Sequence, residues 1–135
     1  MILNDILNFY NLIKNINIKD ISNSEDKYKL LKIFRTLKHY NEEFEKFKKD
    51  AKDKIIVDKE KFSKKLEESK ENKEAKEYVD NINSELTSLF IKEIMSDKKD
   101  ISFDKISKDS FIQISNTNDL TLEQLDCIEQ NIVET

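Results

Sequence analysis

The chain has 135 residues, of which 24 are lysine or arginine and 28 are aspartate or glutamate, so its net charge at pH 7 is −4. It contains no glycine and no proline, which excludes collagen-like and proline-rich proteins and every motif built on glycine, such as phosphate-binding loops and dinucleotide fingerprints. Hydrophobic residues make up 37% of the chain, and this content and length predict one folded domain over residues 1–135.

The first 15 residues predict a helix with a narrow polar stripe. Asparagines at positions 4, 8, 11 and 15 fall on that stripe, and nearly all other positions are apolar. The apolar surface is wider than the roughly 100° that a helix on a domain surface needs. Such a helix lies at the centre of the core or is shared between the core and a partner, and the sequence leaves both interpretations open.

A long helix is expected to start near residue 22 and to continue to about residue 54. Ser22-Asn23-Ser24-Glu25 fits a capping box, and apolar positions from Leu30 to Ala51 keep the 4-3 spacing of about four heptads. A second helix is expected to begin with Asp58 as its cap. Its pattern weakens near Glu71-Asn72 and regains periodicity to about Met95. Lysine and glutamate alternate over residues 42–77, as on a solvated helical hairpin, and the triplet Ile55-Ile56-Val57 predicts a short strand at its tip.

Other segments show the period of two that is typical of strands. They are Ile16 with Ile18, Ile101 with Phe103, and the run from Phe111 to Ile114. After them, Thr121 and Gln124 form a capping box that starts a final helix from Leu120 to Val133. The predicted fold class is therefore mainly α (α+β): a long helical hairpin with a small antiparallel sheet of short strands and a capped C-terminal helix.

The residue types that most often carry chemistry are scarce. His39 and Cys127 are the only residues of their kinds, and one of each cannot complete a zinc site without several carboxylates. Cys127 lies beside the apolar face of the last helix, where an inert thiol is the usual occupant. The carboxylates alternate with lysines, as on a solvated surface. We expect no catalytic, cofactor-binding or metal-binding residue, and therefore no enzyme.

The charges are unevenly distributed along the chain. Residues 1–41 hold seven basic and four acidic residues, whereas residues 78–135 hold five basic and twelve acidic ones. A pI near 5.2 and a single arginine disfavour nucleic-acid binding. The asparagine stripe lacks the lysines that attract anionic lipid, and no apolar run is long enough to span a membrane. The uneven distribution of charge along the chain favours contacts with other proteins, including further copies of this chain.

Two sets of apolar residues are the candidates for such contacts. The first helix exposes more apolar surface than a core needs, and strand edges can pair with a partner strand. No basic start or unbroken apolar stretch of a signal peptide opens the chain, so we do not expect it to be secreted. The candidate partner-binding residues are Ile6, Phe9, Tyr10, Ile13, Ile16, Ile18, Phe111 and Ile114.

The order of these elements resembles that of small uncharacterised proteins of tailed bacteriophages. The resemblance rests on the apolar first helix ending in Asn15-Ile16-Asn17-Ile18-Lys19, the charged helix from Leu30 to Asp50, the segment Phe111-Ile112-Gln113-Ile114 and the last helix. It implies a phage-encoded protein of the virion or of its assembly, located in the host cytoplasm or in the particle. The alternative is a small acidic inhibitor of a host defence or regulatory enzyme.

Overall fold

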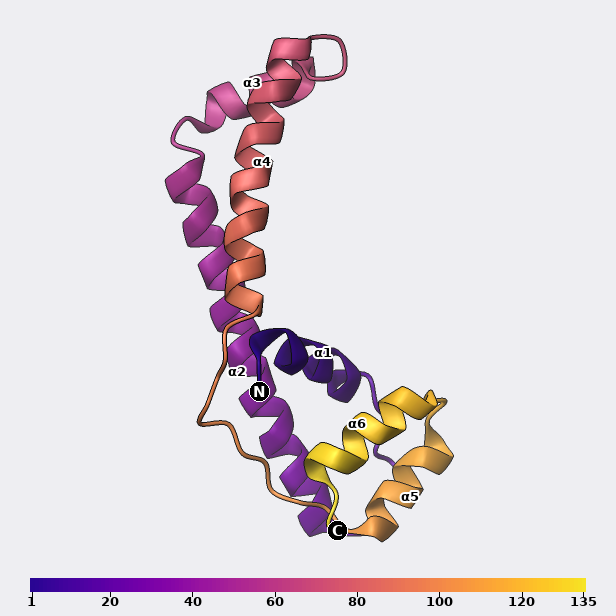
Figure 1. Cartoon of the computed structure of the whole chain (residues 1–135). Helices are drawn as coiled ribbons and strands as arrows, with labels where there is room; N and C mark the ends of the chain where they lie inside the picture. The colour runs from indigo at the N-terminus through magenta and orange to yellow at the C-terminus, as the bar shows by residue number, and fades with distance from the viewer. The chain divides into compact units, whose positions relative to one another are not determined.

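The computed structural model describes all 135 residues, and it is all-helical, with six helices that cover 72% of the chain and no sheet (Figure 1). The predicted fold class, with its antiparallel sheet, is therefore wrong. The helices are α1 (Leu3–Lys14), α2 (Ser24–Ile55), α3 (Lys59–Glu68), α4 (Lys73–Ile94), α5 (Lys108–Thr117) and α6 (Leu122–Ile132).

The chain forms two compact units. One comprises residues 1–41 and 97–135, and the other comprises residues 42–96. The first unit therefore contains α1, the first half of α2, α5 and α6, and the second contains the rest of α2 with α3 and α4. That the chain is a single domain stays a prediction.

The apolar face of α1 supplies much of the core of the first unit. Leu3, Ile6, Phe9 and Ile13 are all buried, and the ring of Phe9 meets that of Phe103 edge-on at 5.7 Å between centroids. Fully buried isoleucines from the other segments complete this core. They are Ile106, Ile114, Ile128 and Ile132.

The segments around Ile16–Ile18 and Ile101–Phe103 are extended links and not strands. The only ladder-like contacts in the protein are isolated bridges between Ile2 and Asp97 and between Ile106 and Val133. A side chain satisfies the backbone of Asn17 in the first link: Asn17 N donates to Asn118 Oδ1 at 2.7 Å, and Asn118 Nδ2 donates to Asn17 O at 2.8 Å. In an extended link, as in a strand, alternate side chains face inwards, so the apolar residues of both repeat every two positions. This repeat alone therefore does not distinguish a link from a strand.

The run Phe111–Ile114, predicted as a strand, lies inside α5. Ser107 caps this helix by accepting a hydrogen bond from Ser110 N at 3.2 Å. Ile106, Ser110 and Ile114 recur every four residues and are all buried, which is a helical period. Four residues are too few to distinguish the two periods, so the serine cap was the better signal.

Hydrogen bonds define the helix caps. The expected cap of α2 at Ser22 is wrong, because Asn23 Oδ1 accepts from Asp26 N at 3.1 Å and Asn23 therefore holds the cap position. Asp58 is confirmed as the cap of α3, since its carboxylate accepts a hydrogen bond from Lys61 N at 2.9 Å. The capping box of Thr121 and Gln124 is also confirmed.

The triplet at residues 55–57, predicted as a short strand, forms no strand. It ends α2 and begins the link to α3.

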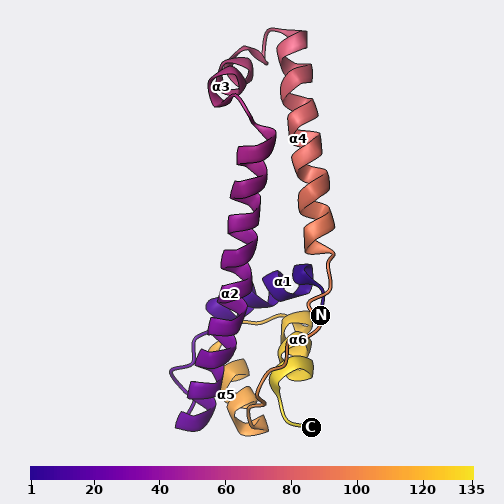
Figure 2. The same ribbon diagram turned by 90° about the vertical axis from the view of Figure 1, so that its left-hand side faces the viewer.

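In the second unit, the C-terminal half of α2 and α4 run antiparallel (Figures 1 and 2). Phe90 of α4 lies edge-on to both Phe44 and Phe47 of α2, at 6.4 Å between ring centroids in each case. Lys61 of α3 places its Nζ 5.0 Å from the ring centroid of Tyr78 in α4. None of the helices has a segment both long and apolar enough to cross a membrane.

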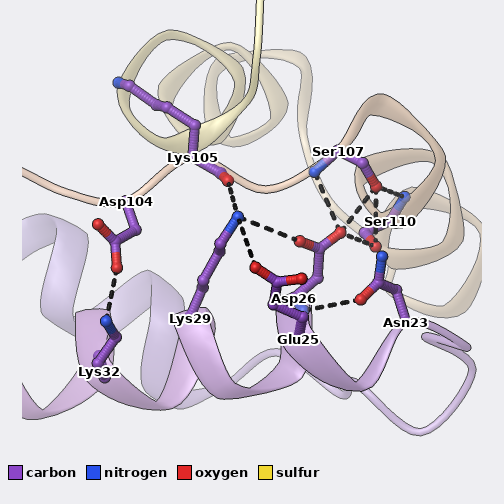
Figure 3. Close-up of polar contacts among 9 residues, drawn as sticks. All are labelled: Asn23, Glu25, Asp26, Lys29, Lys32, Asp104, Lys105, Ser107 and Ser110. Carbon is purple, nitrogen blue, oxygen red and sulfur yellow. Dashed lines mark hydrogen bonds and ion pairs between the residues drawn. The ribbon is translucent and has the colours of Figure 1, made fainter.

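One buried carboxylate ties α2 to α5 (Figure 3). Asp26 is 3% exposed, and its Oδ2 accepts hydrogen bonds from Ser110 Oγ at 2.6 Å, from Ser107 Oγ at 2.7 Å and from Ser107 N at 3.1 Å. Lys29 lies 3.9 Å from the other carboxylate oxygen. A buried charge needs such donors, because its transfer from water is otherwise very costly.

The balance of burial and hydrogen bonding sets the ionisation of Asp26. Burial by itself raises the pKa of this carboxyl group, but the hydrogen bonds from Ser110 and Ser107, with the charge of Lys29, outweigh it and hold the pKa below the ordinary value of 3.8. A group with a lowered pKa in the folded state stabilises the fold above its unfolded pKa. That stabilisation is lost as the pH falls through the folded pKa.

We expect Asp26→Asn to destabilise the protein by about 1–3 kcal/mol at pH 7, because a neutral amide oxygen replaces a carboxylate as the acceptor of three donors. Urea unfolding of both proteins measures this difference. The difference stays constant above about pH 5, shrinks as the pH falls below about 3.9, and disappears once Asp26 is protonated in the folded wild type.

The matched control is Asp104→Asn. Asp104 pairs with Lys32 of α2 at 2.7 Å, and both side chains are about half exposed. Exposed ion pairs add little to stability, so this variant is expected to unfold close to the wild type. Equal destabilisation by the two substitutions contradicts the role assigned to Asp26.

Candidate protein-interaction site

An apolar pocket lies in the first unit where α1 passes into α2. It has a volume of about 230 Å³, which is below the ~300–1,000 Å³ of typical small-molecule sites. It therefore matches one inserted side chain better than a whole ligand. Lys14 is the only charged residue in its lining. The other lining residues are Ile13, Ile16, Ile18, Leu30, Leu31 and Phe34.

Three of the eight candidate partner-binding residues meet at this pocket: Ile13 at the end of α1, and Ile16 and Ile18 in the following link. The half-buried Tyr10 lies beside it, because its ring stacks on that of Phe34 with 5.8 Å between centroids and 24° between planes. These residues were predicted from two separate features, the apolar helix and the strand-like link. The tertiary structure joins them into one surface.

The other four candidates lie elsewhere. Ile6, Phe9 and Ile114 are buried in the core of the first unit, so their side chains are not available to a partner in this fold. Phe111 is half-buried and lines a separate groove with Lys108, where α5 meets the end of α6. The strand edge expected at Phe111–Ile114 does not exist, because these residues are helical.

Basic side chains surround the apolar pocket. Lys14 Nζ lies 5.4 Å from the ring centroid of Tyr10, and Lys38 Nζ lies 6.0 Å from that of Phe34. Along α2, Lys27 and Arg35 are each one turn from Leu31. The surface thus has an apolar centre and a basic rim, the usual anatomy of a protein interface.

Sequence reasoning missed Leu31, which is 40% exposed and forms part of the pocket wall. It lies one residue outside the heptad seam that Leu30 and Phe34 follow. The available signal was the spacing Lys27, Leu31, Phe34 and Lys38, whose 4-3-4 intervals place two apolar residues between two lysines on one helix face. That face shares Phe34 with the seam, but its other three residues lie beside the seam.

A larger open groove, of about 830 Å³, separates α1 from α6. The asparagine stripe of α1 lies here: Asn8, Asn11 and Asn15 line the groove opposite Gln124 and Asn131 of α6. Asn8, Asn11 and Asn15 are exposed, so the core leaves this face of α1 uncovered. Its lining also includes three carboxylates, from Asp5, Glu123 and Asp126, and no lysine or arginine.

Cys127 also lines this groove, and its surroundings raise the pKa of its thiol. Burial raises the pKa of Cys127, the negative charges of Asp126 and Asp5 raise it further, and a weak hydrogen bond from Asn131 opposes them. His39 is not part of the groove lining, so no Cys-His pair forms there. No group of three or more His, Cys, Asp or Glu side chains is arranged to hold a metal ion.

We expect Cys127 to react slowly with iodoacetamide at pH 8, because its thiolate fraction is lower than that of free cysteine, whose pKa is about 8.5. The rate of alkylation against pH is expected to have its midpoint above that value. Asp126→Asn removes a nearby negative charge and is expected to lower the midpoint, whereas Asp119→Asn, the matched loss of charge, leaves it in place. A wild-type midpoint at or below that of free cysteine contradicts this assignment.

Comparison with known proteins gave no match to a family model, to a curated protein or to a solved structure.

Proposed function

We propose that this chain is a non-enzymatic protein-binding component, a structural or assembly protein that acts by docking on other protein surfaces. The supporting observation is the apolar pocket of α1 and α2, where Ile13, Ile16 and Ile18 line one small cavity together with Leu31 and Phe34. A virion or assembly protein of a phage, as the resemblance of the chain implies, works through contacts of this kind.

The dimensions and chemistry of the pocket indicate what it binds. Its volume suits a single apolar side chain, and interfaces often depend on one or two such anchors seated in a pocket. The cations at Lys14 and Lys38 favour carboxylates on the partner beside the anchor, because opposite charges at the rim steer the two surfaces together. The partner segment is therefore a leucine or similar anchor with acidic neighbours.

Methyl NMR of the full chain tests this function with two synthetic peptides. Each carries one leucine, flanked by glutamates in the first peptide and by lysines in the second. We expect the acidic peptide to shift the methyl signals of Ile13, Ile16, Ile18 and Leu31 in a saturable way, since its leucine enters the pocket and its carboxylates meet the basic rim. The lysine peptide is expected to bind more weakly.

Leu31→Lys is the control, because it removes an apolar wall at an exposed position and lysine is a good helix former. It is expected to abolish the shifts at the remaining three isoleucines. The absence of saturable shifts at the pocket, or equal binding of the two peptides, would count against the proposed function.

The groove between α1 and α6 favours a second candidate, an acidic inhibitor of a basic host enzyme. Asp5, Glu123 and Asp126 line it without a basic side chain, so it attracts a cationic partner. Binding that depends on these exposed charges weakens as salt is added, because screening shortens the range of the attraction. This candidate would be favoured by a host enzyme that binds to the groove. Its binding is expected to be lost when Glu123 is changed to glutamine and Asp126 to asparagine.

A further inference from the structure

The start of α6, in the same unit, carries an exposed leucine of the kind that the pocket accepts. Leu122 is 85% exposed, the highest value for a large apolar side chain in this unit. It is the first residue of α6, N-terminal to the buried Ile128 and Ile132 of the same helix. An apolar side chain in this position has no role in the core and is free to contact another molecule.

The capping box holds Leu122 in place. Thr121 Oγ1 accepts a hydrogen bond from Gln124 N at 3.2 Å, and Gln124 Oε1 accepts one from Thr121 N at 2.9 Å. The backbone on both sides of Leu122 is therefore fixed by these two bonds. A rigid anchor loses little conformational entropy when it binds, which favours association.

The surroundings of Leu122 are acidic. Asp119, Glu123 and Asp126 are its near neighbours in the chain and are all exposed. The whole segment 109–135 contains six acidic residues and no basic one. Around the pocket the signs are reversed, since Lys14, Lys27, Arg35 and Lys38 surround its apolar lining.

We propose that Leu122 of one copy inserts into the α1–α2 pocket of a second copy, with Glu123 and Asp126 facing the basic rim. An apolar side chain with acidic neighbours meets an apolar pocket with basic neighbours, so both the hydrophobic and the electrostatic parts of the contact are complementary. The contact joins two different surfaces of the same chain and therefore builds a dimer or a longer assembly. The inference rests on the proposed function, because it names the partner of the same pocket.

Sedimentation equilibrium of the full chain over a range of concentrations tests this contact. We expect the wild type to associate reversibly, with an apparent dissociation constant that rises when the ionic strength increases from about 0.05 M to about 0.5 M. Leu122→Glu removes the anchor but keeps the acidic character and suits the first turn of a helix. It is expected to raise the dissociation constant about tenfold or more, as loss of a buried leucine does.

Leu66→Glu is the matched control, since Leu66 is also an exposed helical leucine, at 51%, but belongs to the second unit. It is expected to associate like the wild type. Leu31→Lys alters the pocket and is expected to weaken association at least as much as Leu122→Glu does. When these two variants are mixed, one supplies an intact anchor and the other an intact pocket, so a one-to-one complex is expected to re-form.

A wild type that stays monomeric, a Leu122→Glu variant that associates as tightly as the wild type, or a mixture that forms no complex would overturn the inference. The peptide experiment separates this failure from that of the proposed function. If the chain is monomeric but its pocket binds the glutamate-flanked peptide, then only the identity of the partner is wrong. If neither the peptide nor a second copy binds at the pocket, then the proposed function fails as well.

Discussion

Burial of α1 is the constraint on which the first unit depends. Its apolar residues cover most of its circumference, and Leu3, Ile6, Phe9 and Ile13 are all removed from water. Each such side chain contributes about 1.5–3 kcal/mol on full burial, so segments from both ends of the chain are needed to cover the helix. Phe103 covers Phe9 from the link before α5, and Ile2 pairs with Asp97 at the start of that link.

The same constraint places the two concave surfaces of the unit. The asparagine stripe is the face that needs no cover, and it borders the open groove opposite α6. At the end of α1 the chain must turn without glycine or proline, and Asn15 and Asn17 occupy this turn. Ile16 and Ile18 then remain half-covered beside α2, where they complete the apolar pocket with Phe34.

Polar groups are satisfied in this protein by side chains where a sheet would use a ladder. Asp26 accepts the donors at the start of α5, Asn118 bonds both backbone groups of Asn17, and Lys29 Nζ donates to the carbonyl of Lys105 at 3.0 Å. These contacts join residues about 80 to 100 positions apart. They hold the links between helices in place, and with them the walls of the pocket and the position of α6.

The opposite charges of the α1–α2 surface and of the C-terminal segment give the two surfaces their distinct preferences. Lysines from α1 and α2, with Arg35, surround the pocket, while residues 109–135 include six acidic residues and no basic one. The phage resemblance and the assembly role stay predictions, and they agree with a chain that carries an anchor and a pocket of opposite charge. Direct contact between copies is the simplest use of both surfaces.

The sequence by itself determined α1, most of α2 and α6, the caps at Asp58 and Thr121, and the uneven charge distribution, because these depend on neighbours within a few residues. It missed α5 and did not separate α3 from α4. It wrongly predicted strands at Ile16–Ile18 and Phe111–Ile114. Apolar residues at every second position, or in a short run, do not show whether a partner strand exists. Only the tertiary structure decided that Ile6, Phe9 and Ile114 are core while Ile16 and Ile18 border a pocket. It also decided that Leu122 is exposed. The physical reason is that burial depends on segments distant in sequence, and no local pattern specifies them.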